Sequence, residues 1–229
     1  MRKFVIISTI VVLLILLALW SPWNNINFSW KKLLGIEKPD SYAGLVVNSL
    51  GGNMEIKIDG ESRGEVNLAN SPIELAEIDP GEHDIELVRK ASVEGGYESF
   101  FKKINFEEGI NSVLSYELGP TNDFSSGYVF YAQSRSNFGG EASLTVTSVP
   151  ETSKVYLNDV VLGEAPMRDV KIALTGKHKL KVEADGYEPL EFEILPDEQT
   201  SRDKLKDYSL YVEVRLFKLP LNVVEEVSE

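Results

Sequence analysis

A pattern that occurs twice, 99 residues apart, is the strongest constraint on how this chain folds. Leu45, Val47, Ser49, Gly64 and Glu65 recur as Leu144, Val146, Ser148, Gly163 and Glu164. The spacing of every pair is the same, so the register holds without an insertion over this stretch. A chain with such self-similarity is built from two copies of one structural unit.

Each copy has the alternation of apolar and polar residues that is typical of half-buried β-strands. In the first copy residues 55–58 alternate and run into Asp59-Gly60, and in the second residues 154–157 run into Asn158-Asp159. These dipeptides tolerate the positive φ angles of a tight turn. The sequence therefore predicts a β-hairpin at the same place in both copies.

The rest of each copy predicts further strands in the same order. A proline-containing loop follows the hairpin, and a third strand begins at His83 and at His178. The later strands are predicted at residues 100–106 and 112–118 of the first copy and at 190–195 and 210–217 of the second. Short strands in this number bury one face of each sheet. We therefore predict an all-β fold with two tandem small antiparallel β-sandwich domains, at residues 42–118 and 141–217.

The N-terminus predicts a transmembrane helix within residues 1–23. Residues 4–20 are apolar apart from Ser8 and Thr9 and carry no charge, which matches the shortest segments that span a bilayer, about 17 residues. The basic pair Arg2-Lys3 precedes the run and favours a cytoplasmic N-terminus. No pair of small residues offers a signal peptidase site, so a retained signal anchor is favoured over a cleaved signal.

Two segments flank these regions. Residues 24–41 are predicted to form a juxtamembrane linker, and residues 218–229 a short acidic tail. This organisation predicts a single-pass protein of the cell membrane whose C-terminal domains are extracytoplasmic.

Composition excludes several classes of protein. The chain has no cysteine, so it has no disulfide, thiolate metal site or cysteine nucleophile. Its net charge of −13 opposes phosphate backbones, which argues against nucleic-acid binding.

The second copy resembles the PEGA domain, a small β-sandwich repeat named for a Pro-Glu-Gly-Ala sequence. The matching residues are Pro150-Glu151, Val155 to Asn158, Leu162 to Pro166, Gly176-Lys177-His178 and Gly186-Tyr187. Thr152 and Ser153 replace the last two residues of the naming motif, and the first copy is more diverged. The resemblance implies an envelope or surface module of bacteria or archaea that carries no catalytic residues.

The sequence predicts no catalytic residue, cofactor or metal site. His83 and His178 occupy the same position in both copies, after a turn glycine, so we expect each imidazole to cap the turn or to cover the edge of the sandwich. Carboxylates near Asp159 and Asp185 leave calcium binding open, but no loop has an ordered ligand spacing. We therefore expect that the protein is not an enzyme.

The segment between the copies, residues 119–140, is unusually aromatic for a linker. Its aromatic residues are Phe124, Tyr128, Phe130, Tyr131 and Phe138. One interpretation is an additional strand or plug at residues 128–132, packed between the domains. The other is an exposed aromatic platform for sugar rings or for a partner.

These observations predict a non-catalytic, membrane-tethered, extracytoplasmic structural or binding module of the cell envelope with a protein or polysaccharide partner. One alternative is a protein that binds cell-wall polysaccharide through the aromatic residues of 119–140. A second is an accessory subunit that pairs an exposed sheet edge with a membrane partner.

Overall fold

The computed structural model describes residues 42–91, 95–134 and 142–220. The predicted transmembrane helix, the juxtamembrane linker, Phe138 and the chain from residue 221 onward lie outside the described residues. Within the described ranges no helix is both long enough and apolar enough to cross a membrane. The described residues belong to one compact unit.

The described chain is nearly all β. The strands of the first copy are β1 (Ala43–Gly51), β2 (Met54–Ile58), β3 (Glu61–Val66), β4 (Ile73–Ile78), β5 (Gly81–Arg89), β6 (Phe100–Phe106) and β7 (Asn111–Glu117). A 3-10 turn, η2 (Asn122–Phe124), leads into β8 (Ser126–Ser134). The second copy contains β9 (Ala142–Val149), β10 (Lys154–Leu157), β11 (Val160–Glu164), β12 (Met167–Ile172), β13 (His178–Glu183), β14 (Leu190–Ile194) and β15 (Tyr208–Arg215). One short helix, α3 (Gln199–Lys204), continues into the 3-10 turn η3 (Leu205–Asp207) before β15.

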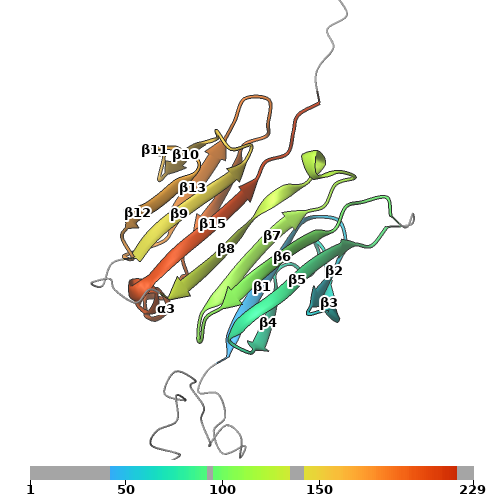
Figure 1. Cartoon of the computed structure of the whole chain (residues 1–229), viewed down its shortest axis with the longest axis horizontal. Coiled ribbons are helices and arrows are strands. Elements are labelled where there is room, and N and C mark those ends of the chain that lie inside the picture. Colours follow the sequence, from blue (N-terminus) through green and yellow to red (C-terminus); the bar gives the residue numbers. More distant parts are fainter. Residues whose placement is uncertain (1–41, 92–94, 135–141, 221–229) are drawn as a thin grey trace, which may run out of the picture. The chain divides into compact units, whose positions relative to one another are not determined.

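The strands form three sheets, and the two copies share the largest one (Figure 1). Each copy contributes one four-stranded outer sheet, in the order β3-β2-β5-β6 or β11-β10-β13-β14. The central sheet has seven strands in the order β12-β9-β15-β8-β7-β1-β4. Strand β8, which comes from the segment between the copies, therefore joins them into one sheet.

The predicted hairpins and later strands are present, but two predictions about the sheets are wrong. The sandwiches are not purely antiparallel, since β1 pairs with β7 and β9 pairs with β15 in parallel. The chain builds the whole outer sheet between these strands, and it returns to the central sheet in its original direction. The predicted proline-containing loops also contain strands, β4 and β12, which pair with β1 and β9 at the sheet margins.

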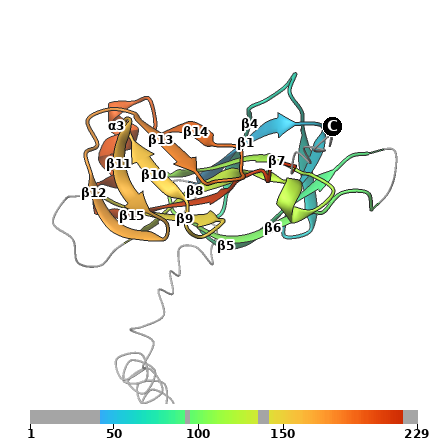
Figure 2. The same ribbon diagram turned by 90° about the horizontal axis from the view of Figure 1, so that it is seen from above.

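The outer sheets cover opposite faces of the central sheet. Side chains of β8 alternate, so that Phe130 and Ala132 enter the core of the second copy while Val129 and Tyr131 enter that of the first. Because β7 and β15 are both antiparallel to β8, these equivalent strands run in the same direction. The rotation axis that relates the two copies therefore runs along β8. A half-turn about this axis exchanges the two faces of the central sheet. Figure 2 shows β13 and β14 on one side of β8 and β5 and β6 on the other.

The two histidines hold equivalent turns, which confirms their predicted structural role. In the first copy His83 Nδ1 lies 2.6 Å from Asp59 Oδ2, and His83 Nε2 lies 2.8 Å from the Asp79 carbonyl oxygen. In the second copy His178 Nδ1 lies 2.8 Å from Asn158 Nδ2, and His178 Nε2 lies 2.6 Å from the Ala173 carbonyl oxygen. Each imidazole thus connects its hairpin turn to the loop that precedes β5 in the first copy or β13 in the second.

The two turns differ in charge. In the second copy the ring contacts the neutral amide of Asn158, which donates to it. In the first copy the ring contacts the carboxylate of Asp59, which accepts from it. The hydrogen bond from His83, followed by that from the Asp84 backbone N–H, holds the pKa of the Asp59 carboxyl below its usual value.

The shared strand predicts that both copies unfold together. Phe130→Ala removes a buried ring from the second core and should cost about 3–5 kcal/mol, and Leu45→Ala in the first core about 2–5 kcal/mol. Calorimetry should show one transition in wild type, and each variant should lower that same transition. Two transitions, each moved by only one of the variants, would contradict a shared folding unit.

The Asp59 turn predicts a pH-dependent contribution to stability. The pKa of Asp59 is lowered in the folded state, so its contribution is present above the unfolded value, about 3.9, and is lost as pH falls through the folded value. The difference in Tm between wild type and Asp59→Asn should therefore shrink as pH falls from 5 to 2. The reciprocal variant Asn158→Asp should acquire the same acid sensitivity, and a pH-independent difference for Asp59→Asn would refute the linkage.

Candidate functional site

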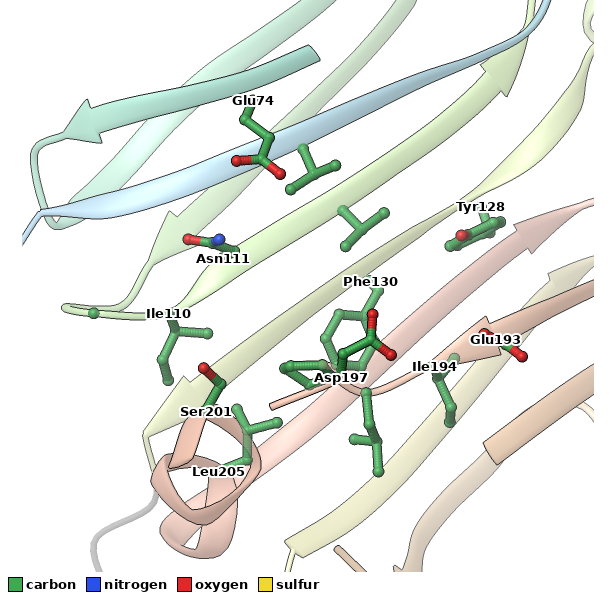
Figure 3. A pocket seen from close by; sticks show the side chains of 15 residues that line it. Glu74, Ile110, Asn111, Tyr128, Phe130, Glu193, Ile194, Asp197, Ser201 and Leu205 are labelled. Atoms are coloured by element: carbon green, nitrogen blue, oxygen red, sulfur yellow. The ribbon is translucent and has the colours of Figure 1, made fainter. Parts of the chain in front are cut away.

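A cleft of about 330 Å³ lies between the central sheet and the end of β14 (Figure 3). Its floor comes from β1, β7 and β8, and its wall from β14, the loop that follows and the helical segment α3–η3. The floor residues are Val46, Val113, Tyr128 and Phe130, and the apolar wall residues are Ile194, Leu195 and Leu205. Polar residues at the rim are Glu74, Asn111, Glu193, Asp197 and Ser201.

Strand alternation exposes the apolar floor of this cleft. Leu45 and Val47 point into the core of the first copy, so Val46 between them points to the opposite face. Val113 is the neighbour of Val46 on β7 and shares that face. Both valines are half-buried. They therefore offer apolar surface outside the core of their own copy.

The cleft is open because a small residue stands at position 113. Leu45 pairs with Ser112 in the first copy, and its equivalent Leu144 pairs with Leu210 in the second. Ser112 and Leu210 are therefore equivalent, and so are the next residues, Val113 and Tyr211. The Tyr211 ring stacks on Tyr131, with centroids 5.1 Å apart and an interplanar angle of 9°. The two stacked rings fill the position on the opposite face of the central sheet that is equivalent to the cleft. The smaller side chain of Val113 leaves the cleft itself unfilled.

A second aromatic stack holds β14 over the floor. The rings of Tyr128 and Phe192 are nearly parallel at 7°, with centroids 3.7 Å apart. Burial raises the pKa of the Tyr128 hydroxyl, which therefore stays neutral over the physiological range. The stack fixes one end of the outer sheet against β8.

A buried arginine holds the wall of the cleft. The Arg202 guanidinium donates to the carbonyl oxygens of Leu174, Pro196 and Asp197, at 3.2, 2.7 and 2.5 Å. It also donates to Gln199 Oε1 at 2.9 Å. These contacts fix the loop after β14 against α3, so the wall is a rigid part of the second copy.

The rim of the cleft is acidic, and part of its charge is balanced. Lys177 Nζ lies 2.7 Å from both Glu193 Oε2 and Asp197 Oδ1, and the hydrogen bonds that it donates to Asp197 and to Glu193 raise the pKa of Lys177 to about 12. On the opposite lip Glu74 pairs with Val46 through the backbone of β4, but its carboxylate has no hydrogen bond or ion pair with another described residue, and Figure 3 shows it above the floor.

Strand β14 ends its sheet, and its outer edge runs along the cleft. The segment before β14 is covered, because Glu188 N donates to the Phe217 carbonyl at 2.8 Å and Leu219 N donates to the Gly186 carbonyl at 2.9 Å. Residues Leu190–Ile194 pair only with β13 among the described strands. Their outward backbone groups are therefore available to an added strand.

The structure places the predicted aromatic residues mostly inside. Strand β8 confirms the interpretation of an additional strand between the copies. The prediction of an exposed platform is wrong for Phe130 and Tyr131, which are 5% and 8% exposed, because alternation sends their rings into the two cores. Tyr128 is half-buried in its stack. Phe124 is 38% exposed and lies 5.7 Å from the Phe217 ring.

The described residues contain no group of three or more histidine or acidic side chains placed to hold a metal ion. Near the turn where calcium was left open, Asp159 lies 3.7 Å from Lys179 Nζ. The cleft itself was missed from the sequence, because its floor and wall come from different copies. The signal that existed was the difference between Val113 and Tyr211 at matched positions.

Comparison with known proteins supports the repeat. The model of the PEGA domain matches residues 42–122 and 141–207. Comparison with curated proteins gave no match. One similar solved structure is that of the Bacillus anthracis TIE protein, at 17% sequence identity and a TM-score of 0.27, over 78% of this chain. The matched part is 34% of that protein, so this chain spans about a third of its length.

Both family matches begin where the repeated pattern begins, and together they contain every strand of the two outer sheets. The chain belongs to the PEGA domain family and carries two copies of the domain.

Proposed function

We propose that this chain is a non-catalytic, membrane-tethered module that binds an extended segment of a partner protein outside the cytoplasm. The segment adds to the free edge of β14 and lies over the apolar floor formed by Val46 and Val113. The observation that carries this proposal is the position of an unpaired strand edge directly beside an open apolar cleft.

Strand addition uses both parts of this site. Backbone groups of Leu190–Ile194 supply hydrogen bonds to any extended chain, independent of its sequence. Alternate side chains of the added strand point toward the floor, where Val113 leaves room for them. Sequence preference then comes from the cleft, and affinity comes from the backbone and from apolar burial.

Two features support a location at the membrane surface. The apolar run of residues 4–20 supports a single-pass anchor. The net charge of −13 keeps the domains away from anionic headgroups. PEGA domains resemble envelope modules, which agrees with a partner in the cell envelope.

Filling the cleft should abolish partner binding without unfolding the chain. Val113→Tyr copies the residue that fills the corresponding place on the opposite face. A photoreactive benzophenone side chain in place of Glu74, at the rim, should crosslink the full chain to its partner in cells that express it natively. The adduct should be digested by protease, and it should disappear when Val113→Tyr is added.

The matched control carries the photoreactive side chain in place of Arg168, which is exposed on β12 at the far margin of the same sheet. An unchanged thermal transition shows that Val113→Tyr is folded. The proposal is overturned by an adduct that survives Val113→Tyr, or by no adduct at all. An adduct that resists protease but is released by a glycan hydrolase would favour the polysaccharide alternative instead.

A further inference from the structure

The return strands of the two hairpins are equivalent in fold but opposite in chemistry. Strand β3 begins Glu61-Ser62-Arg63 and β11 begins Val160-Val161-Leu162, at positions related by the same repeat. Each strand is the outermost of its sheet. Each also has a register shift at the same place, just before Gly64 or Gly163. The difference therefore lies in the side chains alone.

Polar contacts cover the edge formed by β3. Ser62 Oγ donates to Glu55 Oε1 at 2.7 Å, and Arg63 lies 3.6 Å from Glu61. Lys90 bridges the carboxylates of Glu55 and Glu65 at 3.6 and 3.1 Å. Charged, mutually satisfied side chains on an edge strand discourage the addition of another strand.

Among the described residues, no polar side-chain contacts of this kind cover strand β11. Val160 and Val161 are 64% and 60% exposed, on a strand that pairs only with β10 among the described strands. β-branched residues have the highest preference for strands, and exposed on an unpaired edge they favour strand addition. An edge with this composition marks an interaction surface unless something covers it.

The charges at the ends of β11 identify the occupant. Strand β11 follows the exposed turn residue Asp159, which also lies 3.7 Å from Lys179 Nζ, and it ends at the exposed Glu164. Antiparallel pairing with a second copy of this chain would place Asp159 opposite Glu164 at both ends, and like charges in directly opposite positions are destabilising. A partner strand with basic residues at these positions would instead form an opposite-charge pair at each end.

We propose that β11 is a second docking edge, distinct from the β14 cleft, and that it takes an extended segment of another protein whose apolar residues are flanked by lysine or arginine. The two docking edges lie at opposite margins of one outer sheet. Both can therefore be occupied in the same molecule.

The test uses the 15N-labelled full chain in detergent micelles and two capped peptides, Lys-Thr-Val-Val-Thr-Lys and its counterpart with glutamate at both ends, whose end residues have the same spacing as Asp159 and Glu164. The lysine peptide should shift the amide resonances of residues 160–164. The glutamate peptide should bind about tenfold more weakly, because two like-charge contacts replace two opposite-charge contacts. Residues 61–65 of β3 provide the internal control and should not shift.

A matched variant transfers the chemistry of β3 to β11 by Val160→Glu, Val161→Ser and Leu162→Arg. Val160 and Val161 are exposed, and Leu162 is half-buried outside the hydrophobic core, so the calorimetric transition should be retained while the peptide-induced shifts are lost. The proposal is overturned if neither peptide shifts residues 160–164, if both peptides bind equally, or if the shifts survive the triple substitution.

Discussion

Strand β8 is hydrogen-bonded to β7 on one side and to β15 on the other, and the rest of the described structure depends on this double pairing. It converts two repeats into one seven-stranded sheet. Because its side chains alternate between the two cores, it also places the outer sheets on opposite faces. Residues 119–140 lie between the two copies, where a linker is expected. Their strand β8 instead forms the middle of the central sheet.

The sequence predicted the elements well where periodicity and turn chemistry agree. The hairpin turns at Asp59-Gly60 and Asn158-Asp159, and the strands that begin at His83 and His178, are visible in local residue patterns. The repeat predicted the architecture of both copies, because matched positions carry matched roles. His83 and His178 show this most clearly, since each ties a turn to the same neighbouring loop.

The parallel pairing within each copy and the arrangement of the two copies could not be predicted in the same way. Parallel pairing of β1 with β7 joins residues that are far apart in the sequence, and no local pattern encodes it. The floor and wall of the cleft, such as Val113 and Leu205, come from different copies. Arg202 was also missed, because a buried arginine satisfied by backbone carbonyls has no signature in a polar loop.

Because the axis that relates the copies runs along β8, each face of the central sheet is covered by the outer sheet of one copy only. Beside that outer sheet the same face presents the uncovered central strands of the other copy. The cleft takes its floor from Val46 and Val113 of the first copy and its wall from Leu205 and its neighbours in the second. The smallest unit that can form this surface is therefore the pair of copies, and neither copy contains it alone.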